Sequence, residues 1–366
     1  MAPSNDKYEC KVRIDDFILS SILSDPEASY LVGSIDNGTS SSRFLLITSA
    51  GKILSTAQVE YEQCFPSSSA YNEGSCAGWH EHNPFEIWDS VAICIVKTVE
   101  ELTKHGLDLS TDTNNSIIKA VGITNQRETT VSWNDRTGRV YYNAIVWDDT
   151  RTAVTAETIA NENTQSNDVA PNDVLRSKTG LPIASYFAAT KVRWLIDNIP
   201  KLQRDLNSPE EREHVRFGTI DTWILYMLTG YRRNIVEMGN NERLAHIGGE
   251  FKTDVSNASR WLFMNLETMN WDESLVQAVC KESTCWGNNK GSGSIPLSAL
   301  PKIVPSVDYT IGTIHGIPCS DESKMALKNA IVGAILGDQQ AALFGQTCFV
   351  PGMAKCTYGT GVSFVM

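Results

Sequence analysis

One short stretch has the residue types that bind phosphate. Residues 35–43 read IDNGTSSSR and lie between two apolar runs. The backbone N–H groups and hydroxyls of Gly38, Thr39 and Ser40 could point into one concavity that suits an anion. Arg43 closes the stretch with a guanidinium fork that matches phosphate oxygens. The same composition is typical of a solvated hairpin turn, and the stretch alone favours that simpler interpretation.

A carboxylate and a second turn strengthen the phosphate hypothesis. Asp36 directly precedes the turn and would repel a phosphate unless a divalent cation lay between them, as in a nucleotide bound with Mg²⁺. A second glycine and threonine turn, which includes Thr360 and Gly361, follows another apolar run near the end of the chain. Two such turns resemble the pattern of the superfamily that contains actin, sugar kinases and chaperone ATPases.

A charged pair follows a β-rich run. Arg127 and Glu128 come directly after residues 117–124, and ligand groups gather at the carboxyl ends of strands in α/β folds. Together they offer donors and an acceptor to a small neutral polyol. An exposed ion pair at a strand end is an equally good interpretation. Trp147 and Tyr186 could cover the carbon face of such a ligand, or could be core residues.

Asp338 is the candidate general base. It follows an apolar run and Gly337, at the predicted start of a helix. Its carboxylate could accept the proton of an attacking hydroxyl, and in a loose phosphoryl transfer its position matters more than a raised pKa. The simpler alternative is that Asp338 caps the helix, which is what most aspartates at such positions do.

The elements around these residues predict an α/β domain with a mixed sheet. A β-meander is expected over residues 30–63, and a helix over 83–106 with Asn83 as its cap. A hairpin is expected over 129–147, a helix over 189–202, and a strand running into a helix over 216–230. Two polar stretches rich in glycine and asparagine, 231–250 and 280–295, read as surface loops.

Composition excludes several classes of protein. The 366 residues are 42% hydrophobic, and no apolar run approaches the roughly 20 residues that cross a bilayer. A net charge of −12 argues against nucleic acid or an acidic membrane surface as partner. Nine scattered cysteines without a CxxC pair indicate free thiols in a reducing compartment, which predicts a cytoplasmic protein.

Seven segments in register resemble the glycerol kinases of the FGGY family of carbohydrate kinases. They are residues 35–44, 78–91, 122–152, 178–198, 217–230, 253–272 and 337–361. The resemblance implies the actin-like ATPase (ribonuclease H-like) fold and the conversion of ATP and glycerol into ADP and glycerol 3-phosphate. A pentose or another polyol as acceptor is the alternative within the family.

The resemblance also implies a role for each matching residue. The implied glycerol contacts are Arg127, Glu128, Trp147, Tyr186, Asp338 and Gln339, with Asp338 as general base. The implied nucleotide and phosphate contacts are Gly38, Thr39, Ser40, Arg43, Thr360 and Gly361. Asp36 is similar to the residue that holds Mg²⁺ through water.

The family pattern also sets expectations for domains. We expect an N-terminal extension over 1–29, the family's N-terminal domain over 30–347, and the start of a second domain over 348–366. Because members of the family continue well past this point, the sequence predicts a truncated chain with weak ATP binding and little turnover. An inactive regulatory or binding fragment is a further alternative, and a homo-oligomer is compatible with the sequence.

Overall fold

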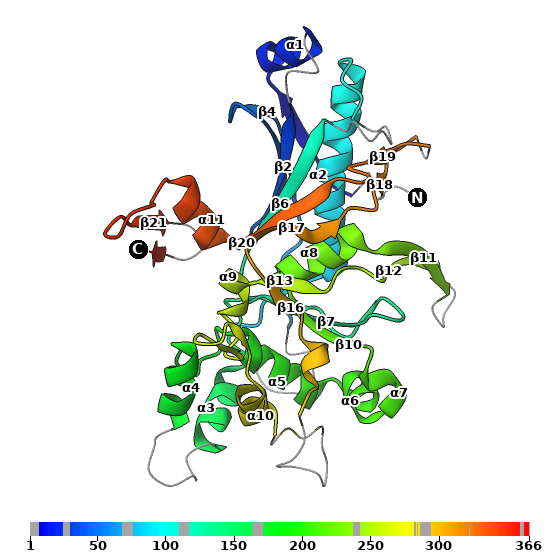
Figure 1. Cartoon of the computed structure of the whole chain (residues 1–366). Helices are drawn as coiled ribbons and strands as arrows, with labels where there is room; N and C mark the ends of the chain where they lie inside the picture. Colours follow the sequence, from blue (N-terminus) through cyan, green and yellow to red (C-terminus); the bar gives the residue numbers. More distant parts are fainter. Residues whose placement is uncertain are drawn as a thin grey trace. The chain divides into compact units, whose positions relative to one another are not determined.

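The computed structural model describes most of the chain (Figure 1). The described residues are 7–24, 30–67, 76–109, 117–162, 171–236, 242–281, 283, 285, 294–321, 323–358 and 362–365. They form two compact units. Unit 1 comprises residues 1–60, 90–127 and 306–366, and unit 2 comprises 61–89 and 128–305. This grouping differs from the predicted boundaries at residues 30 and 347, which stay a prediction.

Unit 1 is built on a seven-stranded mixed sheet with strand order β1-β4-β3-β2-β6-β20-β17. Its strands are β1 (Lys11–Ile14), β2 (Leu31–Asn37), β3 (Ser41–Thr48), β4 (Ile53–Glu60), β6 (Ile118–Asn125), β17 (Val307–Thr313) and β20 (Ile331–Gly337). β2, β6 and β20 run parallel to one another, and the other pairings are antiparallel. The predicted α/β class with a mixed sheet is confirmed.

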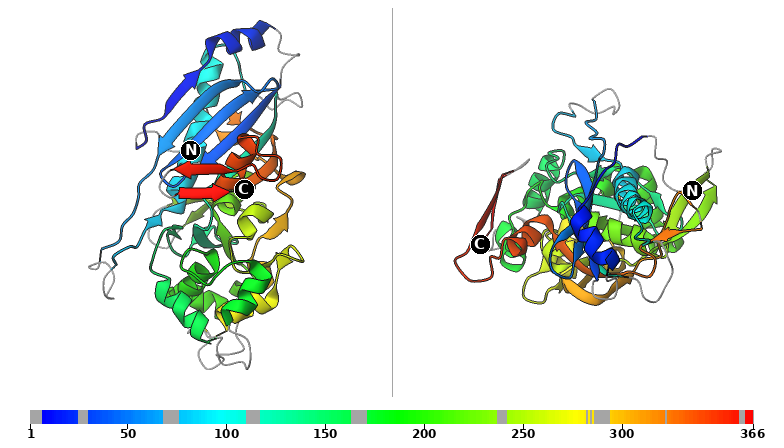
Figure 2. Two further views of the ribbon diagram at one scale, coloured as in Figure 1. Left: turned by 90° about the vertical axis from the view of Figure 1, so that its left-hand side faces the viewer. Right: turned by 90° about the horizontal axis from the view of Figure 1, so that it is seen from above.

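The predicted meander forms the N-terminal part of this sheet, where Figure 2 shows its blue strands side by side. Residues alternate between buried and partly exposed along β2, as expected for a strand with one face on the core. Residues 11–14, which lie ahead of the predicted core, add β1 as an edge strand on β4. The helices of unit 1 are α1 (Asp16–Ser24), α11 (Asp338–Gly345) and most of α2 (Pro84–Lys104).

The start of α2 confirms the predicted cap, because Asn83 Oδ1 accepts a hydrogen bond of 3.0 Å from the backbone N–H of Phe85. The nine cysteines are free, as predicted. In the part of the chain that the structure describes, no helix is both long and apolar enough to cross a membrane.

Unit 2 contains a five-stranded sheet with the order β10-β7-β9-β5, in which β8 also pairs with β7. Its strands are β5 (Glu81–His82), β7 (Thr130–Asn134), β8 (Arg139–Val140), β9 (Ala144–Ile145) and β10 (Val215–Thr219). Its helices are α3 (Ala153–Glu162), α4 (Pro171–Thr179), α5 (Ala188–Asn198), α6 (Pro200–Asn207), α7 (Pro209–Arg212), α8 (Ile220–Thr229), α9 (Val255–Ala258) and α10 (Glu273–Cys280). The predicted strand and helix over 216–230 are β10 and α8.

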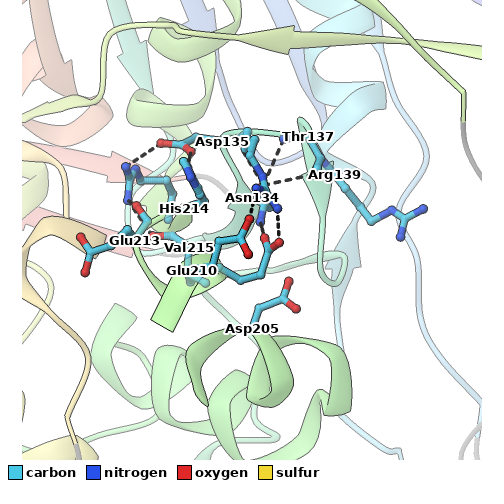
Figure 3. Close-up of polar contacts among 12 residues, drawn as sticks. Asn134, Asp135, Thr137, Arg139, Asp205, Glu210, Glu213, His214 and Val215 are labelled. Carbon is cyan, nitrogen blue, oxygen red and sulfur yellow. Dashed lines mark hydrogen bonds and ion pairs between the residues drawn. The ribbon is translucent and has the colours of Figure 1, made fainter. Parts of the chain in front are cut away.

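The predicted hairpin over 129–147 is confirmed, and a polar cluster fixes its turn (Figure 3). Asn134 Oδ1 accepts hydrogen bonds from the backbone N–H groups of Arg136 and Thr137. Asp135 pairs with His214 at 2.8 Å and with Arg216 at 2.6 Å, which ties the turn to β10. These contacts hold the turn of the hairpin in one conformation and join it to β10.

Two sequence predictions in unit 2 are wrong. The helix expected over 189–202 is two helices, because Pro200 has no N–H to continue α5 and begins α6 instead. The loop expected over 231–250 is largely a hairpin of β11 (Tyr231–Val236) and β12 (Glu242–Ile247). Of the other predicted loop, 280–295, residues 282, 284 and 286–293 lie outside the described residues.

Short pairings complete the fold. In unit 2, β13 (Lys252–Asp254) pairs with β16 (Lys302–Val304), β14 (Met264–Asn265) pairs with β15 (Asn270–Trp271), and η4 (Leu297–Ala299) precedes β16. In unit 1, β18 (Ile317–Pro318) pairs with β19 (Met325–Ala326), and β21 (Lys355–Tyr358) pairs with β22 (Val362–Val365). The last pair confirms the hairpin predicted near the end of the sequence.

Candidate active site

The parallel strands of unit 1 bring three predicted site residues to one edge of the sheet. On β2, Asp36 lies opposite Thr124 of β6, and on β20, Gly337 lies opposite Asn125 of β6. Asp338 follows Gly337, and Arg127 comes two residues after Asn125. Parallel strands end on the same side of a sheet, so Asp36, Arg127 and Asp338 gather there.

Asp36 is paired with Arg43 across the β2–β3 hairpin. The two residues are direct partners in the ladder, and Arg43 Nη1 lies 3.3 Å from Asp36 Oδ2. Burial raises the pKa of Asp36, the charge of Arg43 opposes that rise, and the charge of Asp338 adds to it. Arg127 lies 3.3 Å from Asp338, so this edge of unit 1 holds two carboxylates and two guanidinium groups.

Buried amides hold the turn between β2 and β3. The backbone N–H of Gly38 donates to the carbonyl of Ser41 at 3.0 Å, which closes the turn. Gln126 Nε2 donates to the carbonyl of Gly38, and buried Asn37 Nδ2 donates to Ser42 Oγ. Ser40 is exposed at the tip and Thr39 is partly exposed. The hydroxyls proposed for phosphate binding therefore lie on a turn that the end of β6 fixes.

Asp338 is not the cap of α11. The cap is Gly337, which has no side chain, and Asp338 is the first helical residue. Its carboxylate lies 3.3 Å from Nε of Arg127 and accepts a hydrogen bond from the backbone N–H of Gln339. The capping alternative is therefore wrong. About a third of the Asp338 side chain (36%) is exposed, so a ligand could reach it.

Gly337 makes room for Arg127. A Cβ atom at residue 337 would lie 2.4 Å from Cδ of Arg127, closer than any real carbon contact. The aliphatic part of the Arg127 side chain therefore lies against bare backbone, and this contact sets the direction of its guanidinium.

Gln339 has a partner that the sequence did not reveal. Lys355 Nζ, on β21, donates to Gln339 Oε1 at 2.7 Å and also hydrogen-bonds with Thr357 Oγ1. Lys355 is only 2% exposed, and it links α11 to the hairpin of β21 and β22. The predicted nucleotide contacts of that hairpin, Thr360 and Gly361, lie outside the described residues.

In unit 2, Glu128 is buried and strained. The residue is 2% exposed, and its φ of 59° lies in the left-handed region that favours glycine. A non-glycine residue held there costs about 1–3 kcal/mol, and such residues cluster at functional sites. Arg260 Nε contacts Glu128 Oε1 at 2.6 Å and neutralises the buried carboxylate. The simpler interpretation of Glu128 as one half of an exposed ion pair is therefore wrong.

Aromatic side chains surround this ion pair. The guanidinium of Arg260 lies over the rings of Tyr186 and Phe187, 5.6 and 4.9 Å from their centroids. Trp147 meets Tyr186 edge to face at 5.8 Å, and both rings are partly exposed. Glu128, Trp147 and Tyr186, which the sequence predicted, therefore lie in one cluster, together with Arg260, which it did not.

Lys191 anchors Tyr186 from inside the core. Its ammonium is fully buried and donates to the backbone carbonyls of Ser185 and Tyr186 at 3.0 and 2.7 Å. Burial lowers the pKa of Lys191 to about 8, although the charges of nearby carboxylates, Glu128 first among them, oppose this shift. The sequence held one signal for it, because Lys191 lies four residues before Leu195 on the apolar face of α5.

The segment that carries Trp147 is fixed on both sides. The backbone N–H of Trp147 donates to Thr129 Oγ1 at 3.2 Å, and Asp148 pairs with His80 at 2.7 Å. Burial raises the pKa of Asp148, but the hydrogen bond and charge of His80 outweigh it and hold the pKa below its usual value. The next carboxylate, Asp149, forms a buried pair with Arg151. The backbone around Trp147 is therefore held in place before any ligand binds.

The carboxylates of unit 1 fit a magnesium–nucleotide complex better than a bare metal. Among the described residues, no group of three or more carboxylate, histidine or cysteine side chains is arranged to hold a metal ion. Magnesium in kinase sites commonly keeps several waters and uses one or two carboxylates together with substrate phosphates. Asp36 is the candidate for such a carboxylate.

The comparisons with known proteins agree with this geometry. The model of the N-terminal domain of the FGGY family of carbohydrate kinases matches residues 31–345. The chain belongs to the FGGY family of carbohydrate kinases. Its seven-stranded sheet and the helix that follows β20 are thus the family's actin-like ATPase fold.

Several FGGY relatives are named glycerol kinases. Glycerol kinase 1 of Streptomyces avermitilis is 40% identical over 339 residues, which cover 93% of this chain and 54% of that protein. Glycerol kinase of Chloroflexus aggregans is 41% identical over 335 residues, 91% of this chain and 53% of that protein. The chain therefore spans about half the length of the curated relatives it matches.

Solved structures give the same picture. Plasmodium falciparum glycerol kinase with ADP superposes with a TM-score of 0.69 and 30% identity, over 92% of this chain and 54% of that one. Xylulose kinase of Lactobacillus acidophilus, at 17% identity and a TM-score of 0.63, shares the fold.

Proposed function

We propose that this chain carries the acceptor site and part of the phosphate site for the ATP-dependent phosphorylation of glycerol. The observation that carries the proposal is Glu128, buried in a strained conformation and held by Arg260 beside Tyr186. A fixed carboxylate accepts hydrogen bonds from hydroxyls, and the rings of Trp147 and Tyr186 suit the carbon face of a short polyol. The similarity to glycerol kinases supports this acceptor.

Proton transfer is assigned to Asp338. In this proposal its carboxylate accepts the proton of the attacking hydroxyl, while Arg127, 3.3 Å away, orients the carboxylate. Arg127 and Gln339 are further proposed contacts of the acceptor. The transition state of phosphoryl transfer needs little covalent help, so the main contribution of these residues is position.

ATP is the proposed phosphoryl donor. Its phosphates are assigned to the β2–β3 turn through Gly38, Thr39 and Ser40, with Arg43 as the charged donor. Thr360 and Gly361 are proposed as contacts from the second turn. Asp36 would hold Mg²⁺ through water, and the ion would neutralise charge that develops on the phosphates.

The test is ADP release in a coupled assay, with glycerol, xylulose and gluconate as acceptors. We expect release with glycerol and a loss of at least about 100-fold for Asp338→Asn, the lower end of what a general base contributes. Because the relatives are about twice as long, glycerol-dependent shifts in melting temperature are measured in parallel. A preference for xylulose would contradict the proposed acceptor, and a glycerol shift without turnover would favour a regulatory binding protein.

A cytoplasmic location and a homo-oligomeric state belong to the same proposal. Cell fractionation tests the first, and sedimentation velocity of the purified chain tests the second.

A further inference from the structure

A groove in unit 1 lies over the sheet face formed by β1, β4 and β3. Its volume is about 580 Å³. Lys7, just before β1, contributes one cation, and Lys11 and Arg13 of β1 contribute two more. Arg43 of β3 contributes the fourth. The carboxylates in its wall are Glu9 and Glu60, so the groove has more positive than negative groups.

The strand register explains why these cations share a face. Lys11 is the ladder partner of Gln58, and Gln58 is the ladder partner of Arg43, so the three residues form one row across three strands. Arg13 lies in the next row, beside Thr56. Residues two apart in a strand point to the same side, and neighbouring strands lie about 4.8 Å apart. The row therefore places cations roughly 10 Å apart, with an amide between them.

The cations of β1 are available to a ligand. Lys11 pairs with Glu9 at 3.5 Å, but both side chains are largely exposed, and such pairs contribute little. Among the residues that the structure describes, Arg13 has no ion-pair partner. The whole chain has a net charge of −12, so this groove is a positively charged region on a protein that is negative overall.

We propose that this groove binds an oligophosphate, with Lys11 and Arg13 as contacts that the family's nucleotide site does not supply. Guanidinium groups match phosphate oxygens in a bidentate manner, and a row of cations about 10 Å long suits several linked phosphates better than one carboxylate. The two cations belong to β1, outside the matched family region of residues 31–345. The inference therefore goes beyond the proposed glycerol phosphorylation and requires no turnover.

Calorimetric titration with inorganic tripolyphosphate tests the proposal. The test variant is Lys11→Gln with Arg13→Gln. The matched control is Lys52→Gln with Lys119→Gln, which removes the same charge from exposed positions of unit 1 outside the groove. We expect the test variant to bind about tenfold more weakly and the control to stay within about twofold of wild type. Binding to wild type should weaken as salt rises.

Two results of this titration would overturn the proposed oligophosphate site. Equal affinities of the test and control variants would overturn the proposal. Arg43 would then keep only its proposed role in nucleotide binding. Absence of binding to wild type at millimolar tripolyphosphate would overturn it too. Circular dichroism of the test variant checks folding, and Asp338→Asn should bind tripolyphosphate like wild type even if glycerol phosphorylation fails.

Discussion

The charged candidate residues of unit 1 and those of unit 2 are held in different ways. In unit 1 the side chains of Asp36 and Arg43 are 32% and 52% exposed, and their pair is 3.3 Å long. In unit 2 Glu128 is buried, its pair with Arg260 is 2.6 Å long, and Lys191 is fully buried. The Asp36–Arg43 pair of unit 1 can exchange partners with a ligand, whereas Glu128 in unit 2 already has a buried partner before a ligand binds.

This difference follows from solvation. An exposed ion pair is worth at most about 1 kcal/mol, so a phosphate or a cation can replace either partner at little cost. A buried carboxylate that loses its partner costs about 3–5 kcal/mol. We therefore expect substitutions in unit 2 to act on stability and acceptor binding together, and those in unit 1 to act mainly on ligand binding.

The largest effect is expected for Arg260→Met. It should lower the free energy of unfolding of unit 2 by about 3–5 kcal/mol, because Glu128 keeps its buried charge without a partner. Urea unfolding measures this change. The control is Arg136→Met, which removes an exposed pair with Glu210 and should change stability by less than about 1 kcal/mol.

A double variant sharpens this result. Arg260→Met with Glu128→Gln should recover most of the lost stability, since no buried carboxylate is left without its guanidinium partner, and should still bind glycerol poorly. If the double variant unfolds as readily as Arg260→Met, the role assigned to the ion pair is wrong.

Lys191→Met should have the second largest effect. It leaves the carbonyls of Ser185 and Tyr186 without this donor, and each unsatisfied group costs about 1–3 kcal/mol, so a loss of at least about 2 kcal/mol is expected. Because Tyr186 loses its anchor, glycerol binding should weaken as well. Lys201→Met, on a less buried lysine, serves as the control in the same unfolding experiment. Unchanged glycerol affinity would show that Lys191 does not position Tyr186.

The next prediction concerns Asp221 of unit 2, whose protonation should make the stability of the protein depend on pH. Burial raises the pKa of Asp221 to about 7, although hydrogen bonds from Thr219 and Thr253 oppose the shift. The folded state then binds its proton more tightly than the unfolded state. Stability from this group is complete below about pH 4 and is lost as pH rises through about 7. Melting curves of wild type should show this fall between about pH 4 and 7, and Asp221→Asn should not. An identical slope in both would exclude Asp221 as its cause.

The smallest effect on stability is expected for Arg43→Gln. Its exposed pair with Asp36 should be worth less than about 1 kcal/mol. Binding of ATP with Mg²⁺ should weaken by about tenfold, because a charge-assisted hydrogen bond to phosphate is lost. Titration calorimetry and urea unfolding measure the two quantities on the same sample. A large loss of stability with normal ATP binding would invert the contrast between the units.

Local sequence patterns identified the candidate residues at the sheet edge of unit 1. Asp36, Arg127 and Asp338 follow apolar runs, and the parallel pairing of β2, β6 and β20 brings the ends of these runs to one edge of the sheet. The cap alternative for Asp338 could be settled only by the structure, because sequence alone does not show whether the cap is Gly337 or Asp338.

Long-range contacts limited the prediction for unit 2. Arg260 meets Glu128 across 132 residues of chain, and no local pattern encodes that contact. The hairpin of β11 and β12 was missed because its polar, glycine-containing sequence has the composition of a loop. The strand β1 was missed because four residues are too few for a clear alternation.

Calorimetric titration of glycerol into wild type and Glu128→Gln tests the central claim most directly. The account predicts saturable 1:1 binding to wild type and binding at least about tenfold weaker to the variant, because the buried acceptor of the polyol hydroxyls is lost. Equal affinity in the two proteins, or no binding to wild type, would contradict it.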